Sequence, residues 1–154
     1  MKVKNLLFIL APVLLTAVFS FAQTNAKKPL QPADLNKVGT VKSSPAYAEV
    51  LLQKTELLSE VESLLVEYTE GYPKIKEMRF EAELLQKEMD KLLAVNPMEA
   101  SKLTPALGKL MVRKCELATT LWSLQLQFND QHPDVKRAKR KLEIFDAAIN
   151  DILK

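Results

Sequence analysis

Tyr68-Thr69-Glu70-Gly71-Tyr72-Pro73-Lys74-Ile75-Lys76 is a nine-residue stretch that the chain repeats, in the same pattern, as Phe128-Asn129-Asp130-Gln131-His132-Pro133-Asp134-Val135-Lys136. Each copy has an aromatic residue, a polar turn, a second ring, a proline and a β-branched residue. A proline fits the first position of a helix, where its missing N–H is not needed. We therefore expect each copy to turn the chain from one helix into the next. The turn residues on which this depends are Tyr68, Tyr72, Pro73 and Ile75, and then Phe128, His132, Pro133 and Val135.

Helical periodicity surrounds both turns. Apolar residues at alternating spacings of three and four form one stripe before each turn and another after it, which is typical of amphipathic helices. Before the first turn the stripe is Tyr47, Val50, Lys54, Leu57, Val61, Leu64 and Tyr68, and after it Ile75, Met78, Ala82, Leu85, Met89 and Leu92. Two such helices joined by a short turn make an antiparallel hairpin.

A shift of sixty residues carries the first hairpin onto the second. The helix start Ser44-Pro45-Ala46 recurs as Thr104-Pro105-Ala106, and even the polar interruption of the stripe is kept, with Lys114 in the place of Lys54. The sequence therefore predicts an all-α protein of two tandem hairpins from a duplicated unit. The expected segments are a signal peptide at 1–22, a flexible leader at 23–42, hairpin 1 at 43–96, a linker at 97–104 and hairpin 2 at 105–154.

The two hairpins differ in a second apolar stripe. Beside the main stripe, the first helix carries Leu51, Leu58 and Leu65, where the second half has Met111, Ala118 and Gln125. A helix with so wide an apolar arc must contact more than its own hairpin partner. Two arrangements satisfy this: a four-helix bundle, or an extended coiled-coil-like array that buries the stripe in a dimer.

The N-terminus has the pattern of an export signal. Lys2 and Lys4 precede an apolar run that ends at Ser20-Phe21-Ala22, with small residues at the positions that signal peptidase reads. Cleavage after Ala22 is expected, and retention of the run as a membrane anchor is the alternative. No later run is long and apolar enough to cross a bilayer. We therefore expect an exported protein, periplasmic or secreted, without a transmembrane helix after cleavage.

The two turns resemble the Tyr-Thr-x-x-His-Pro-x-Val signature of bacterial polysaccharide chain-length determinants, a family of co-polymerases. In that family the motif lies in the helical periplasmic part, between a long helix and its return. The resemblance covers the hairpins only. It departs from the family at Tyr72, which replaces the histidine, and in the absence of a bracketing pair of transmembrane helices. It implies a periplasmic helical hairpin and does not imply control of polymer length within the membrane.

Catalytic and metal chemistry have little support. His132 lies between Asp130 and Asp134, but Asp134 is also favoured by the helix dipole in a first turn, and Lys74 occupies the matching place in the first copy. Cys115, the single cysteine, lies about 20 Å from the turn along a continuous helix. A Cys–His dyad within the hairpin is therefore excluded. We expect no catalytic residues, no metal site and no cofactor.

Two further groups are candidate interaction surfaces. A basic run on the last helix comprises Lys136, Arg137, Lys139, Arg140 and Lys141. It suits an anionic envelope polymer, or else forms a solvated face paired with the glutamates of the first helix. Phe80 and Trp122 lie off the main stripes, where they either pack between the hairpins or mark a partner surface.

These observations favour a non-enzymatic structural or interaction protein of the cell envelope, accessory to polysaccharide assembly. The expected partner is another protein or a second copy of the chain, with an anionic envelope polymer as a further candidate and no nucleic acid. The alternative function is a small periplasmic chaperone that holds unfolded clients on an apolar helical surface.

Overall fold

In the computed structural model of the chain, residues 39–154 are described, and they are helical with no strand among them. The expected signal peptide and most of the leader lie outside these residues. The helices are α2 (Pro45–Leu64), α3 (Pro73–Ala94), the short 3-10 helix η1 (Pro97–Lys102), α4 (Pro105–Gln125) and α5 (Pro133–Leu153).

Each of the four long helices begins with a proline that the sequence singles out. Ser44 and Thr104 stand before α2 and α4 in extended backbone, and each hydroxyl accepts a hydrogen bond from a backbone N–H in the first helical turn. These caps satisfy N–H groups that have no partner within the helix. Asn96 caps η1 in the same way, through Met98 N. The linker between the hairpins is therefore itself helical.

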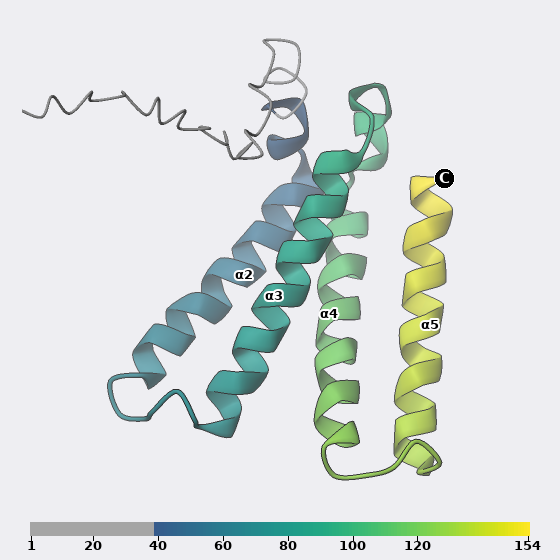
Figure 1. The fold of residues 1–154 in the computed structure, drawn as a ribbon. Helices are drawn as coiled ribbons and strands as arrows, with labels where there is room; N and C mark the ends of the chain where they lie inside the picture. The colour runs from purple at the N-terminus through teal and green to yellow at the C-terminus, as the bar shows by residue number, and fades with distance from the viewer. Residues whose placement is uncertain (1–38) are drawn as a thin grey trace, which may run out of the picture.

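The helices form two antiparallel hairpins whose turns lie at the same end of the molecule (Figure 1). The extensive helix contacts among the described residues join α2 to α3, α4 to α5, and α4 to both α2 and α3. Helix α5 lies on the far side of α4, at the edge of the molecule. This arrangement confirms the predicted all-α fold of tandem hairpins.

One apolar core joins the two hairpins. Residues of α2, α3 and α4 meet in it, and Ile149 contributes from α5. Its fully buried side chains include Val50, Leu85, Leu107 and Met111. Val41 is also buried there, and residues 39–42 are helical, so the last four residues of the expected leader belong to the folded part of the chain. A smaller core near the first turn comprises Val61, Ile75 and Met78.

The hairpins approach each other most closely where α2 crosses α4. Gly108 is buried at this crossing, and a Cβ there would lie 2.8 Å from Glu49 Cβ and 2.9 Å from the Ala46 carbonyl oxygen. The Ala46 N–H donates a hydrogen bond of 3.2 Å to the Leu103 carbonyl, which supplies a partner at the start of α2. Small side chains on both helices therefore fix the register of one hairpin on the other.

Within the described residues, no helix combines the length and the apolar character needed to cross a membrane.

Candidate functional site

The two turns are closed by stacked rings. Tyr68 and Tyr72 lie with ring centroids 4.3 Å apart, and Phe128 and His132 with centroids 4.1 Å apart. In both turns the rings are nearly parallel. The two copies of the motif therefore build the same turn. The β-branched residues that follow, Ile75 and Val135, are fully buried and anchor each turn to its hairpin.

His132 is the N-cap of α5. Its Nδ1 accepts a hydrogen bond of 3.2 Å from the Asp134 N–H at the start of α5, and that nitrogen lies 3.8 Å from the Asp134 carboxylate. Asp130 does not contact His132 in this way. It forms an ion pair with Lys139 at 2.9 Å and accepts a hydrogen bond of 3.2 Å from Gln125. Among residues 39–154, no group of three or more acidic, histidine or cysteine side chains is arranged to hold a metal ion.

Phe80 and Trp122 stack on each other between the hairpins. Their ring centroids lie 4.9 Å apart, and each ring is half-buried. The expected alternative in which they pack between the hairpins is therefore the one observed. Beside them, Ser123 donates a hydrogen bond of 3.0 Å to the Glu77 carboxylate. These contacts hold the C-terminal end of α4 against the N-terminal part of α3.

The basic run of α5 is exposed except for the half-buried Lys139, and it forms its ion pairs locally. Arg137 pairs with Asp134 and Arg140 with Glu143, both within α5, and Lys139 pairs with Asp130 in the turn. The hydrogen bonds from Lys139 and Gln125 lower the pKa of Asp130. None of the ion pairs found among the described residues joins this run to the glutamates of α2, so the expected pairing with the first helix is replaced by these local contacts.

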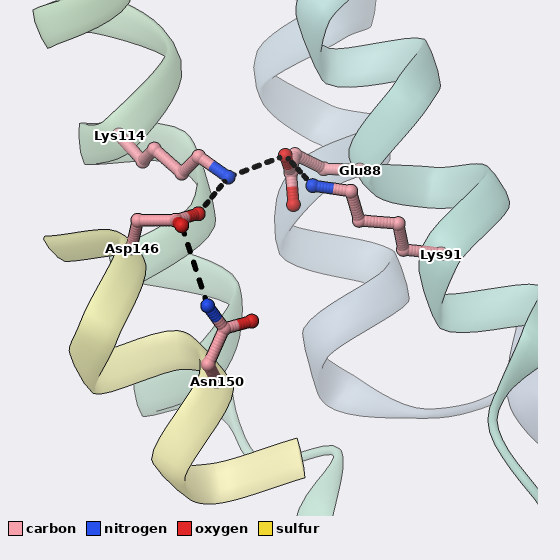
Figure 2. Close-up of polar contacts among 5 residues, drawn as sticks. All are labelled: Glu88, Lys91, Lys114, Asp146 and Asn150. Atoms are coloured by element: carbon pink, nitrogen blue, oxygen red, sulfur yellow. Dashed lines mark hydrogen bonds and ion pairs between the residues drawn. The ribbon is translucent and has the colours of Figure 1, made fainter. Parts of the chain in front are cut away.

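A polar network crosses the seam between the hairpins and centres on Lys114 (Figure 2). The Lys114 ammonium lies 2.5 Å from the Asp146 carboxylate of α5 and 3.1 Å from Glu88 Oε1 of α3. Lys91 approaches the same Glu88 oxygen at 2.7 Å, and Asn150 donates to Asp146 at 3.3 Å. Lys114 therefore connects three helices.

The interactions within this network favour the charged forms of Lys114 and Asp146. Burial alone would lower the pKa of Lys114, but the hydrogen bond to Asp146 and the charge of Glu88 outweigh it and hold that pKa above its usual value. The hydrogen bond from Lys114 lowers the pKa of Asp146. Glu88 is 4% exposed, and its Oε2 lacks a hydrogen-bond partner among the described residues. The Lys91 and Lys114 ammonium groups together are thus the charges that compensate the buried carboxylate.

The first hairpin contains a version of the same network. Lys54, the counterpart of Lys114, donates a hydrogen bond of 2.5 Å to Gln86, which stands sixty residues before Asp146. Gln86 in turn donates to Asp90 at 2.8 Å, as Asn150 does to Asp146. The two copies therefore use the same two positions with the acid and the amide exchanged: Gln86 and Asp90 in the first copy, Asp146 and Asn150 in the second. In the part of the chain that the structure describes, Lys114 also has a partner in the other hairpin, Glu88, and Lys54 has none there.

Cys115 is buried in the seam beside this network. The thiol is 2% exposed, and burial together with the charge of Glu88 raises its pKa to about 12. The thiolate is the reactive form of cysteine, so this environment suppresses nucleophilic chemistry. The side chain packs in the common core of the two hairpins.

One face of α2 has no covering helix among the described residues. Its exposed side chains include Leu51 and Leu58, each 42% exposed, and Leu52, 57% exposed. The same positions of α4 are covered, because Met111, the counterpart of Leu51, is fully buried. The open face of α2 comprises Ala48, Leu51, Leu52, Thr55, Leu58, Ser59, Glu62 and Ser63.

No family model, curated protein or solved structure matches the chain.

Sequence reasoning found the ring pairs, the prolines and the second apolar stripe, and it missed Glu88 and Asp146. Both acids fall within a helix rich in charged residues, so neither stands out alone. A signal was present in the repeat, since the sixty-residue offset places Gln86 opposite Asp146 and Asp90 opposite Asn150. Reading those pairs against the two lysines of the stripes would have indicated a polar layer in each hairpin.

Proposed function

We propose that the chain is an exported, non-enzymatic helical interaction protein of the cell envelope, periplasmic or secreted, that binds a protein through the open face of α2. The observation that carries the proposal is the exposure of Leu51, Leu52 and Leu58 on one side of a single helix. Contiguous apolar surface rimmed by polar residues is typical of protein-binding sites. Glu62 and Ser59 supply such a rim here.

The placement of the reactive side chains supports a non-enzymatic role. The only histidine accepts a hydrogen bond from the backbone of α5, and the only cysteine is buried with a raised pKa. The buried acid Glu88 is paired with Lys91 and Lys114. Each of these three groups thus has a structural task, which supports a role without catalysis.

The link to polysaccharide assembly rests on the turn motif and on the basic run. The turns at Tyr68–Ile75 and Phe128–Val135 resemble those of the chain-length determinants, and Lys136 and Lys141 add exposed positive charge on α5. An anionic envelope polymer is the ligand that such a face attracts in an exported protein. Nucleic acid is not expected in that compartment.

A second candidate function is that of a small periplasmic chaperone. The exposed leucines of α2 favour it, because a chaperone binds clients through apolar surface. The two functions differ in selectivity. An interaction protein has one fixed partner, whereas a chaperone contacts many unfolded chains at the same face.

Site-specific photo-crosslinking in the producing cell tests the proposal. A photoreactive residue replaces Thr55, which is exposed at the centre of the open face, and in a matched control it replaces Lys87, which is exposed on α3. We expect one discrete adduct from position 55 and none from position 87. A broad smear from position 55 favours the chaperone, and equal labelling at both positions contradicts a site on α2.

A further inference from the structure

The open face of α2 is the repeat counterpart of the face through which α4 docks on hairpin 1. Helix α4 contacts hairpin 1 through Gly108, Met111, Cys115, Trp122 and Ser123. Sixty residues earlier stand Ala48, Leu51, Thr55, Glu62 and Ser63, all exposed. The chain therefore carries two copies of one docking face. One is used within the molecule, and the other is uncovered among residues 39–154.

The surface that receives α4 also has a counterpart that the described residues leave uncovered. On hairpin 1, α4 contacts Ala46, Glu49, Glu77 and Phe80, and it lies alongside Glu81 and Leu84. The residues sixty positions later on hairpin 2 are exposed, and Ile144 among them is 59% exposed. This receiving face of hairpin 2 comprises Ala106, Lys109, Arg137, Arg140, Lys141 and Ile144.

We infer that the open face of α2 binds the receiving face of hairpin 2 on a second copy of the chain, which repeats between molecules the docking of α4 on hairpin 1. The inference rests on the proposed function, because both use the open face of α2, and it names the partner. A donor face and a receiving face on different parts of one molecule give a head-to-tail contact, which generates open chains or rings.

Charge at the two faces is complementary. In the place of the Trp122–Phe80 stack, the intermolecular contact sets Glu62 of one copy opposite Arg140 of the next. In the place of the Ser123–Glu77 hydrogen bond it sets Ser63 opposite Arg137. Arg137 and Arg140 now form ion pairs with neighbours on their own helix, and such exposed pairs exchange at little cost.

Apolar contacts and backbone approach fit the same docking. Leu51 takes the place of the buried Met111, and Ile144 takes the place of Leu84, which packs on the core. Ala48 stands where Gly108 approaches Ala46, and its Cβ requires the helices to cross slightly farther apart than α2 and α4 do. The exposed leucines and Ile144 thereby gain burial that the isolated molecule does not provide.

Sedimentation velocity of the purified protein over a concentration series tests the inference. We expect concentration-dependent association that Leu58→Glu, Glu62→Arg and Arg140→Glu each weaken at least tenfold. Glu60→Arg makes the same charge change two residues from Glu62, on the opposite side of α2, and should leave association unchanged. All these side chains are exposed, and circular dichroism melting verifies that each variant is folded.

Mixing the charge variants gives the decisive result. A mixture of Glu62→Arg with Arg140→Glu should regain association, because opposite charges again meet at every contact of an alternating chain. Monomers at all concentrations, failure of the mixture to associate, or equal weakening by Glu60→Arg would each overturn the inference. A monomer that still yields one heterologous adduct from position 55 would leave the proposed function standing, and a monomer that yields none would refute both.

Discussion

The Lys114 ammonium lies 2.5 Å from the Asp146 carboxylate and joins α4 to α5 at the level where it also reaches the buried Glu88 of α3. The corresponding contact of hairpin 1, between Lys54 and Gln86, involves a neutral partner and stays within its hairpin. The duplicated lysine therefore has two different tasks. In the first copy it holds one hairpin together, and in the second it also joins one hairpin to the other.

Replacing Lys114 with methionine should destabilise the protein strongly. The change leaves Glu88, which is almost fully buried, with Lys91 as its remaining charged partner. We expect a loss of about 2 kcal/mol in the free energy of unfolding, between the costs of breaking a buried and an exposed ion pair. Urea denaturation measures it. Lys54→Met is the matched control and should cost less, because its partner Gln86 carries no charge.

The double variant Lys114→Met with Glu88→Leu separates charge burial from general damage. Removing the buried acid together with Lys114 abolishes a carboxylate that Lys91 alone compensates less well, so the double variant should be more stable than Lys114→Met alone. Equal or lower stability of the double variant would show that the lysine acts by packing and not by charge.

Acid should remove the contribution of Asp146 to stability. Its pKa is lowered in the folded protein from an ordinary value of 3.8, so its ionised form stabilises the fold above that value and the contribution fades as the pH falls through the folded pKa. Asp146→Asn should therefore be less stable than wild type at neutral pH, and the difference should disappear as the pH falls through the lowered pKa of Asp146. Burial raises the pKa of Glu81, so the contribution of Glu81 to stability changes with pH in the opposite direction. This contribution is the same in both proteins and therefore cancels in the difference.

Gly108→Ala should destabilise the protein although alanine is the better helix former. The new Cβ would lie 2.8 Å from Glu49 Cβ and 2.9 Å from the Ala46 carbonyl oxygen, so the two hairpins must move apart. A net loss of about 1–2 kcal/mol is expected after the propensity gain. Thermal melting measures it. Gly71→Ala is the control, since its nearest contact is Thr69 Oγ1 at 3.6 Å, and no loss is expected there.

His132→Tyr should reproduce the first turn within the second. The ring stack survives, as between Tyr68 and Tyr72, but the hydrogen bond from the Asp134 N–H to His132 Nδ1 is lost. The expected cost is about 0.5–1 kcal/mol, the value of a helix cap. Addition of zinc should shift the melting temperature of neither protein, and any shift that anionic polysaccharide causes through the basic run of α5 should be the same in both. A shift confined to wild type would make this turn a ligand site.

Export should leave a mature protein that begins at Gln23. The prediction follows from Lys2, Lys4 and the apolar run that ends at Ala22, all of which lie outside the described residues. Mass spectrometry of the protein from envelope fractions measures the mature N-terminus. Detection of the intact chain from Met1 would instead indicate an uncleaved anchor.

Much of the fold was predictable because the local signals agree with one another. The prolines at positions 45, 73, 105 and 133 start the four long helices, and the ring pairs close both turns. The sequence left open how hairpin packs on hairpin. That choice depends on the close contact at Gly108, and one glycine in a helix does not reveal by itself which neighbour approaches it.

The candidate surface was only partly predictable. Periodicity identified Leu51 and Leu58 as part of a second apolar stripe. Either a four-helix bundle or an extended array that dimerises could have covered this stripe. Phe80 and Trp122 had two possible roles for a similar reason, since their angular positions on separate helices do not reveal that the two rings meet. Contacts between segments far apart in the chain depend on the packing of whole helices, which local patterns do not fix.

The buried Cys115 thiol in the seam is a built-in probe of how often the two hairpins separate. Because Cys115 is 2% exposed and its pKa is raised to about 12, an alkylating reagent reaches a reactive thiolate only when α4 lifts away from α3. The labelling rate of the unmodified protein therefore reports how often the two halves part. It can be read in any buffer, variant or assembly without adding a dye or another cysteine.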